Sequence, residues 1–446
     1  MLLLTDGSVL IQNQGNCNCG SSDWWRLAPD ITGNYVNGTW NQVASMPSGY
    51  APLYFASAIL PDGRVIVEGG EYNNGSLVWT NQGAIYDPVA DSWTSVIPPD
   101  GGNGEWSRIG DGPSTLLANG TFMFGASGYS GTTVEALLDP SNLTWTDTGS
   151  GKADGNGEEG WSLLPTGDVL TVDTGNGTNT ELYDPKSGTW SSAGNTPQSL
   201  IFDGEVGPQV TRPDGTVFAV GATGHNAVYS TSAGTWSAAP DFPVIGGDQY
   251  DEADGPAAVL PDGKVLLMAS PGEYQMPSHF FLFDGVNLTA TEDTPDAANL
   301  SSFFGFMLML PTGQVLFNDR AGGFWVYNSG AKKFPKSAPI ITSVPVTITR
   351  GTQYTLRGRQ LSGLTQGAAY GDDYQSATNY PLVRVTNAAT GHVFYARTVD
   401  FTRTAVAPLV RGSTEFTFPD SAETGASMLS VVANGVSSKA VSVTIQ

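Results

Sequence analysis

Acidic side chains recur at one position of a repeated unit in this 446-residue sequence. Each lies eight to ten residues ahead of a glycine that sits between two apolar runs: Asp111, Glu158, Glu159, Glu205 and Asp254. Carboxylates that face each other across a cleft can act as acid and base, or as nucleophile, in cleaving a glycosidic bond. The same groups can bind Ca²⁺ or accept backbone N–H bonds in turns. The residue types leave these three roles open.

The unit that carries these acids occurs seven times, and it must position them. Its glycines recur at a period of about fifty residues, as propeller blades do: Gly7, Gly63, Gly120, Gly167, Gly215, Gly263 and Gly313. Apolar residues flank Pro261-Asp262-Gly263, which predicts a β-hairpin whose glycine has a positive φ. Later in the unit Tyr183 and Trp190, and their counterparts, mark a third and a fourth strand. We predict a seven-bladed β-propeller with the tryptophans packed between blades.

A second region begins where the repeated unit stops, after Phe334. Apolar residues alternate with polar ones at Val344, Val346 and Ile348, and again at the chain end, as in antiparallel strands. We therefore predict an all-β chain with two domains. The propeller spans 1–337, and a small immunoglobulin-like β-sandwich spans 338–446.

The composition excludes several classes of protein. Gly 56, Pro 28 and only 14% charged residues favour short strands and tight turns over helices. Asp and Glu outnumber Lys and Arg by 42 to 19, and this negative field repels phosphate backbones and anionic lipid. No apolar run has the length of a transmembrane helix. We expect a monomer with no nucleic-acid partner and no membrane insertion.

Secretion and redox state are read from a few further features. Sequons throughout the chain and few lysines are typical of an extracellular protein, and Met1 to Leu4 do not form a signal peptide. We expect a secreted protein whose signal peptide is absent from this chain. Cys17 and Cys19 are one residue apart, so a disulfide between them would be strained, and a metal site would need other ligands.

Closure of the units into a ring would bring the loops ahead of the inner strands to one face. There the acids would meet the rings of Tyr54, Phe303 and Phe304. The loops between second and third strands add a mixed set without metal-ligand spacing: Glu71, Tyr72, Asp173, His225, Glu273, Tyr274, His279, Asp319 and Arg320. The stretch Asp154, Asn156, Glu158 alternates oxygen ligands but lacks the rest of a calcium loop. No metal site is predicted, and Ca²⁺ is the ion that the acids would accept.

The repeated unit, the late strands and the segments Pro381–Arg384 and Val432–Asn434 resemble the galactose oxidase-like kelch proteins. In the copper radical oxidases of that family an adjacent tyrosine and histidine open the last inner strand, where Phe303 and Phe304 stand here. The resemblance places the remaining ligands at Arg397 and Asp111. Phenylalanine and arginine cannot replace phenolate and imidazole on Cu(II), so the resemblance implies the fold without the oxidase chemistry.

The chain is also similar to microbial extracellular kelch-repeat proteins that carry a segment like Tyr370-Gly371-Asp372-Asp373. We predict a secreted, carbohydrate-directed protein, with a polysaccharide or oligosaccharide as partner. If it is an enzyme, it is glycoside hydrolase-like, and its catalytic carboxylates are Glu159, Glu205 and Asp254. The predicted substrate-binding residues are Tyr54, Trp106, Asp111, Trp161, Tyr250, Phe303, Phe304, Arg320 and Arg397. A propeller that binds glycans or proteins without catalysis is the alternative, and a copper oxidase with another ligand set is the third.

Overall fold

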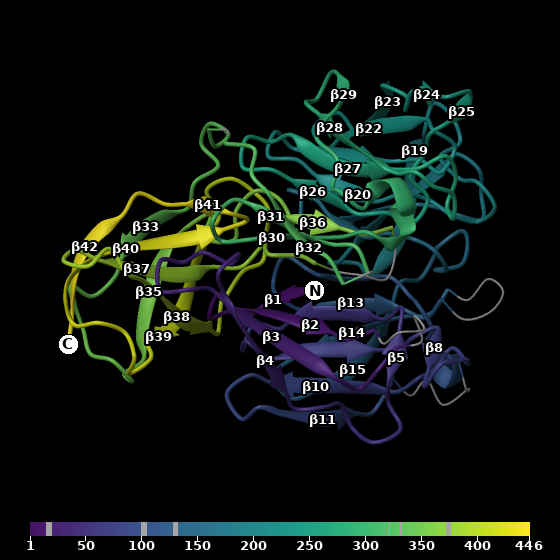
Figure 1. Ribbon diagram of the computed structural model, residues 1–446. Helices are drawn as coiled ribbons and strands as arrows, with labels where there is room; N and C mark the ends of the chain where they lie inside the picture. The colour runs from purple at the N-terminus through teal and green to yellow at the C-terminus, as the bar shows by residue number, and fades with distance from the viewer. Residues whose placement is uncertain (15–19, 100–104, 128–132, 321, 331, 372–375) are drawn as a thin grey trace.

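The computed structural model describes the chain except for residues 15–19, 100–104, 128–132, 321, 331 and 372–375 (Figure 1). Cys17, Cys19, Asp372 and Asp373 therefore lie outside the described residues. The described part consists of strands joined by loops, with short 3-10 turns η1 (Glu105–Ser107), η2 (Ala297–Asn299) and η3 (Ser302–Phe304). Within the described residues, no helix has the length and the apolar character needed to cross a lipid bilayer.

Small antiparallel sheets follow one another along most of the chain, one for each repeated unit. The first two contain β1 (Leu2–Leu3), β2 (Val9–Gln12), β3 (Trp24–Ala28) and β4 (Thr39–Val43), then β6 (Ala56–Ile59), β7 (Val65–Glu68), β10 (Gly83–Asp87) and β11 (Ser92–Val96). The next two contain β12 (Ser114–Leu116), β13 (Phe122–Gly125), β14 (Glu135–Asp139) and β15 (Thr144–Thr148), then β16 (Ser162–Leu163), β17 (Val169–Val172), β18 (Asn179–Asp184) and β19 (Thr189–Asn195).

The later sheets keep this order with two departures. The fifth contains β20 (Gln209–Thr211), β21 (Thr216–Ala219), β22 (Asn226–Ser230) and β23 (Thr235–Ala239), and the sixth β26 (Ala257–Val259), β27 (Val265–Ala269), β28 (His279–Phe283) and β29 (Leu288–Ala290). The sixth gains β36 (Ala368–Ala369), and the last has only β30 (Phe306–Met309), β31 (Val315–Asn318) and β32 (Phe324–Tyr327). Loops add two small sheets: β5 (Pro52–Leu53), β8 (Tyr72–Asn73) and β9 (Ser76–Leu77) form one of three strands, and β24 (Val244–Ile245) pairs with β25 (Asp248–Gln249).

The hairpin turns at the seven glycines form as predicted. Val259 pairs with Val265 across Pro261-Asp262-Gly263, and Gly263 has φ +89°. The other turn glycines, at the same place in their sheets, have φ between +81° and +95°. A side chain there would be strained, so the repeat of glycine follows from the repeat of the turn.

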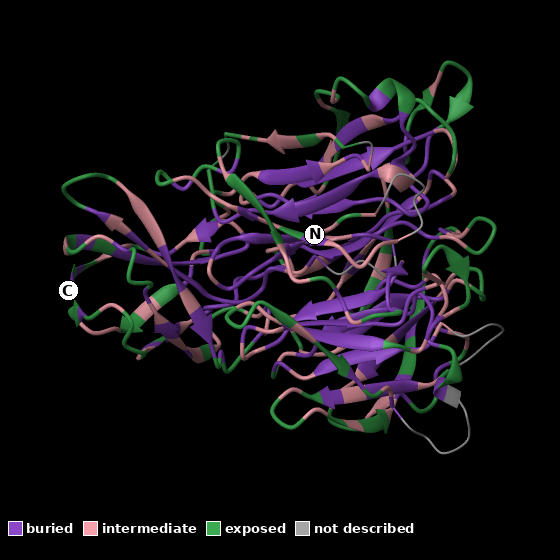
Figure 2. Cartoon of the chain, turned by 60° about the horizontal axis from the view of Figure 1, so that its bottom comes forward, coloured by how far each residue is buried: buried purple, intermediate pink, exposed green. Residues whose placement is uncertain are grey.

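The inner strands are buried and the outer strands are exposed (Figure 2). All residues of β26 and β27 are buried, whereas two of the three in β29 are exposed. The tryptophans of the outer strands donate their indole N–H groups 48 to 56 residues back along the chain, to the preceding sheet: Trp93 to Ala44, Trp145 to Ile97 and Trp236 to Thr180. This confirms the prediction that these rings pack between neighbouring sheets.

The C-terminal strands form a separate group, at the left of Figure 1. Their pairing follows one path through β33 (Ile340–Ser343), β35 (Tyr354–Arg359), β39 (Arg411–Thr417), β38 (Val393–Val399), β37 (Leu382–Asn387), β40 (Gly425–Ala433), β42 (Val441–Ile445) and β34 (Thr347–Ile348), with β41 (Val436–Ser437) beside β40. Leu356 and Phe416 from one half of the path share a buried cluster with Val383, Leu429 and Val443 from the other. The path therefore closes around its own core.

One segment of this C-terminal region enters the small sheets. The side chain of Gln366 accepts a hydrogen bond from the Leu163 N–H at 2.7 Å and donates to Thr115 Oγ1 at 3.1 Å. Directly after it, β36 pairs with the inner strand β26 (Figure 1). The Tyr370 hydroxyl donates to the Phe303 carbonyl at 2.9 Å. The segment 366–371 thus ties the inner ends of distant sheets together.

The variant Gln366→Leu is expected to lower the free energy of unfolding by about 1–3 kcal/mol, because it leaves the Leu163 N–H without its partner. Urea unfolding monitored by tryptophan fluorescence measures this. Gln42→Leu, at an exposed position of β4, is the matched control. An equal loss in both variants would show that Gln366 does not join the two regions energetically.

Candidate functional site

Three carboxylates from consecutive repeated units converge at one end of the inner strands. They are Glu158, Glu205 and Asp254, ahead of β16, β20 and β26, and one oxygen of each lies within 4.8 Å of the others. Glu158 and Asp254 have φ values of +59° and +43°, in the left-handed region that non-glycine residues seldom occupy. Such strain persists only where the surrounding structure enforces it, and it is frequent in binding sites. We call these three residues the acid trio.

Tyr274 joins the acid trio to an aromatic cluster. Its side chain is 62% exposed, and its ring meets Phe303 edge-on with centres 5.2 Å apart. Burial, a hydrogen bond with Glu273, and the charges of Glu205 and Asp254 all raise the pKa of the Tyr274 hydroxyl, so it stays protonated. The site therefore offers an exposed ring and a hydroxyl donor next to carboxylates.

Arg320 stands at the centre of the aromatic cluster. Its guanidinium carbon lies 4.8 Å from the ring centre of Phe303, 4.6 Å from Phe306 and 5.1 Å from Tyr54. Its Nη1 donates to the Tyr54 hydroxyl at 3.0 Å. Tyr54 and Arg320 also have left-handed φ values, +54° and +53°. Cation–π attraction thus holds a planar donor at the end of the inner strands. We call Tyr54, Tyr274, Phe303, Arg320 and the acid trio together the mouth.

Asp111 lies at the same rim but is largely closed off. It is 7% exposed and accepts a hydrogen bond from Ser127 Oγ. Burial, then the charges of Glu71 and Asp111, raise the pKa of Tyr72, whose ring stands 6.1 Å from that of Tyr54. The predicted residues Tyr54, Asp111, Phe303 and Arg320 are therefore brought close to one another.

A cavity of about 480 Å³ opens beside Arg320, between the first sheet and the last. Rings and amides line it, including Trp25, Trp40, Phe324, Gln12 and Asn318. Trp25, Trp40 and Phe324 are each between 36% and 39% exposed. None of these three rings was predicted to bind a ligand, and Trp40 was assigned with the other outer-strand tryptophans to packing between sheets.

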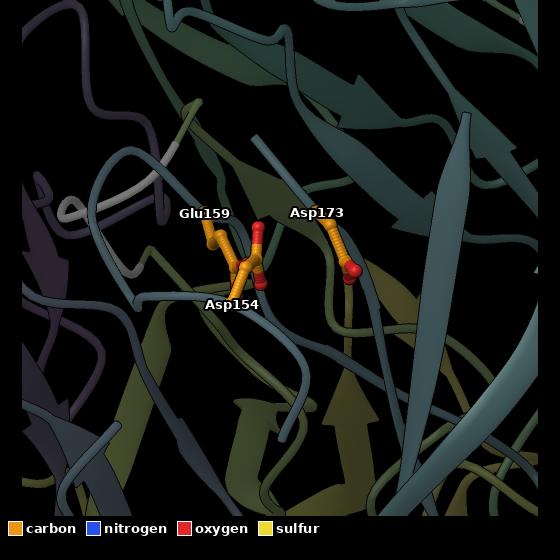
Figure 3. Close-up of side chains that lie close together, drawn as sticks. All are labelled: Asp154, Glu159 and Asp173. Atoms are coloured by element: carbon orange, nitrogen blue, oxygen red, sulfur yellow. The ribbon is translucent and has the colours of Figure 1, made fainter. Parts of the chain in front are cut away.

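Glu159 does not belong to the mouth, which corrects the prediction of a catalytic residue. Its side chain is fully buried and accepts from Lys152 Nζ at 2.8 Å, Thr171 Oγ1 at 3.1 Å and Trp161 Nε1 at 3.4 Å. Asp154 and Asp173 lie beside it (Figure 3). Because Glu158 and Glu159 are adjacent and point in different directions, Glu158 takes the place predicted for Glu159.

Lys152 is the one cation that pairs with this buried group among the described residues. Its Nζ also donates to Asp154 at 2.9 Å and lies 3.5 Å from Glu181. Burial alone would lower the pKa of Lys152, but the charges of Glu159 and Asp154 outweigh it, so the pKa is raised. We call Lys152, Asp154, Glu159, Asp173 and Glu181 the lysine cluster.

Three predicted stacking platforms are buried in the core. Trp106 is 4% exposed and packs against Phe124, and Trp161 is 2% exposed and packs against Trp190. Tyr250 is also 2% exposed and stacks on His279. Their rings have no free face for a ligand, so the prediction that they bind substrate is wrong.

The stretch Asp154, Asn156, Glu158, whose oxygen ligands alternate as in a calcium loop, does not form one site. Asp154 binds Lys152, Glu158 joins the mouth, and the Asn156 side chain is buried near the carbonyls of Ala126 and Val134. The three residues therefore do not share a site, although they alternate in the sequence.

Arg397, which was predicted to bind substrate from its match to a family ligand position, lies elsewhere. It lies in β38 opposite Thr417, within the C-terminal strands. The segment that reaches the mouth from that region contains Tyr370-Gly371, where a Cβ added to Gly371 would come within 2.6 Å of Asp254 Oδ1. The C-terminal region thus contacts the mouth through a different segment from the one predicted.

One solved structure shares this architecture over the full length of this chain. No family model matches the chain. A kelch-like protein, terF, of Aspergillus terreus is 30% identical over 106 residues, which is 23% of this chain and only 21% of that protein. A fungal alcohol oxidase of the AA5 family, solved with copper, aligns over 100% of this chain and 96% of its own with 15% identity and a TM-score of 0.54. YCF48 bound to a D1 peptide aligns over 73% of this chain and 97% of its own at 13% identity, with a TM-score of 0.45.

The residues present do not fit the copper of the AA5 neighbour. Phe303 and Phe304 carry no donor atom, Arg397 lies in β38, and Asp111 accepts a hydrogen bond from Ser127. These four positions offer no set of imidazole and phenolate ligands. What the chain shares with this neighbour is its architecture over the full length, and with the kelch-like protein terF a stretch of 106 residues. The chain therefore has the kelch-type, galactose oxidase-like propeller fold.

Proposed function

We propose that the protein is an extracellular carbohydrate-binding propeller and that the mouth binds a neutral oligosaccharide or polysaccharide. Sugar rings present apolar faces to aromatic side chains and hydroxyls to carboxylates. The observation that carries the proposal is the contact of the exposed Tyr274 ring with Phe303 beside the acid trio. Arg320, in its aromatic cage, adds a donor for a sugar oxygen.

The proposal includes the finer architecture. Each small sheet would be one blade, giving seven blades over 1–337, and the closed path of strands over 338–446 would be an immunoglobulin-like sandwich. The arrangement of sheets and the separate C-terminal core support this division. A ring of blades is what brings acids from distant units to one mouth.

A second candidate is hydrolysis of a glycoside at the same mouth. Retaining enzymes hold their two carboxyl groups about 5–5.5 Å apart, which leaves no room for a water between acid and nucleophile. The oxygens of Glu205 and Asp254 lie within 4.8 Å of each other, which favours this geometry over that of inverting enzymes. Glu205 and Asp254 would serve as acid and nucleophile, with Glu158 beside them.

The variant Tyr274→Ala is expected to weaken oligosaccharide binding about tenfold, because it removes the exposed stacking face. Titration calorimetry with a panel of neutral oligosaccharides measures this. Tyr274→Phe keeps the ring and serves as the control, so it should bind nearly as the unchanged protein does. The proposal fails if no member of the panel binds, or if Tyr274→Ala binds as tightly as the unchanged protein.

Single variants separate binding from catalysis. Glu205→Gln and Asp254→Asn keep the shape of the mouth and remove one charge each. If the mouth is catalytic, each variant should abolish the release of new reducing ends while oligosaccharide binding persists. Unchanged release in both variants, or no release by the unchanged protein, would rule out hydrolysis at this site and leave the binding proposal standing.

A further inference from the structure

The two regions of the chain differ sharply in charge. Residues 338–446 contain eight Lys and Arg against six Asp and Glu, whereas 1–337 contain 11 against 36. Most of the basic residues of the C-terminal region are arginines, and three of them, Arg357, Arg359 and Arg411, lie on two neighbouring strands. Cations are therefore gathered in one place on a strongly acidic protein.

These three arginines line a groove of about 470 Å³ on the outer face of the C-terminal strands. Arg359 of β35 is the direct partner of Arg411 of β39, and Arg357 is two residues away on the same face. The intervening Gly358 and Gly412 also pair with each other. Three hydroxyl side chains complete the lining: Thr342, Thr402 and Ser413. We call this the arginine groove.

None of the three arginines forms an ion pair with an Asp or Glu among the described residues. The nearest acid along β39, Glu415, accepts a hydrogen bond from Thr355 at 2.8 Å. Like charges directly opposite each other in a ladder destabilise a sheet. Arg359 and Arg411 therefore carry a cost that a bound anion would remove.

We propose that the arginine groove binds an acidic polysaccharide, a second site independent of the mouth. Guanidinium groups form paired hydrogen bonds with planar carboxylates and with sulfate oxygens. The threonine and serine hydroxyls can bond to sugar hydroxyls between the anionic groups. A groove that crosses two strands suits a chain molecule, and a single small anion would use only part of it.

Nucleic acid is a poorer fit to the same groove. Its lining contains no aromatic ring on which a base could stack, and three arginines neutralise few phosphates. The 25 excess negative charges of residues 1–337 would repel the rest of a long duplex. A flexible acidic sugar chain can turn away from that surface outside the groove, whereas a stiff duplex cannot.

Binding of polygalacturonate, dextran sulfate, neutral dextran and duplex DNA by the full chain tests the proposal. We expect at least one of the two acidic polysaccharides to bind, and this binding to weaken as salt is added. Any binding of neutral dextran would occur at the mouth and should not change with salt or with the arginine variants. Arg359→Gln with Arg411→Gln should weaken binding at least about tenfold, because two charge-assisted contacts are lost. The two acidic probes show whether carboxylate or sulfate is preferred.

The control pair is Lys332→Gln with Lys439→Gln, which removes the same charge at exposed positions outside the groove. It should bind as the unchanged protein does. Arg411→Glu gives a second readout: an opposite charge facing Arg359 should raise Tm while binding is lost. The proposal is overturned if neither acidic polysaccharide binds, if both double variants weaken binding equally, or if duplex DNA binds as tightly. Glu205→Gln in the mouth should leave this binding unchanged, which keeps the two sites distinguishable.

Discussion

Replacing Lys152 with methionine is expected to lower the free energy of unfolding by about 3–5 kcal/mol, the usual cost of breaking a buried ion pair from one side. The Lys152 side chain is fully buried and contacts Asp154, Glu159 and Glu181. Methionine fills a similar volume but leaves these carboxylates without their cation. Urea unfolding at neutral pH, followed by tryptophan fluorescence, measures the loss.

Two further variants make this prediction specific. Lys186→Met changes the same residue types at an exposed position in the turn between β18 and β19 and should cost little stability. Adding Glu159→Gln to Lys152→Met should restore part of the stability, because it removes the charge closest to the missing cation. A loss in Lys152→Met no larger than in Lys186→Met would mean that the lysine cluster does not stabilise the fold.

The turns and strands of the small sheets were accessible from sequence because one local rule repeats. Each hairpin needs a residue at positive φ between two apolar runs, and glycine meets that need at Gly263 and its six counterparts. The packing of the tryptophans was predictable for a similar reason. A ring that recurs in the outer strands contacts the preceding sheet at a recurring place. Repetition thus turns a weak local signal into a strong one.

The site was predicted less well, because it depends on where single side chains point. Glu158 and Glu159 lie at nearly the same distance from Gly167, so spacing could not decide which of them reaches the mouth. A lysine seven residues ahead of Glu159 is the signal that could have separated them, since a lone cation among acids often pairs in the interior. The prediction that three aromatic rings bind substrate failed for another reason. A large ring near an inner strand usually belongs to the core, as is the case for Trp106, Trp161 and Tyr250.

The contacts that the C-terminal region makes with the small sheets could not be predicted from local sequence patterns. Gln366 and Tyr370 contact residues 67 to 251 positions away, and nothing in their own sequence marks those partners. The comparison of Arg397 with a family ligand rested on a neighbouring Thr-Val pair, which says nothing of how the strand is oriented. Contacts of this kind are set by the docking of whole regions, which short motifs do not encode.

The variant Glu135→Gln is expected to raise the free energy of unfolding at pH 8 by on the order of 4 kcal/mol and to leave it unchanged near pH 4. Burial raises the pKa of Glu135 from 4.5 to about 8, although the charge of Lys152 and the nearby amide of Asn156 oppose the shift. The folded protein therefore binds a proton that the unfolded chain releases. The stability that this proton contributes is fully present below pH 4.5 and is lost as pH rises through about 8.

Glutamine has nearly the same shape and stays neutral, so the variant should lose less stability than the unchanged protein between pH 5 and pH 8. Unfolding curves across this range give the two slopes, and Glu292→Gln, at an exposed position, should reproduce the slope of the unchanged protein. Some slope should remain in Glu135→Gln, because burial also raises the pKa values of Glu68 and Glu252. If the slopes of Glu135→Gln and Glu292→Gln coincide, Glu135 is already ionised in the folded protein. Lys152 must then compensate the charge of Glu135 in addition to those of the carboxylates that it contacts.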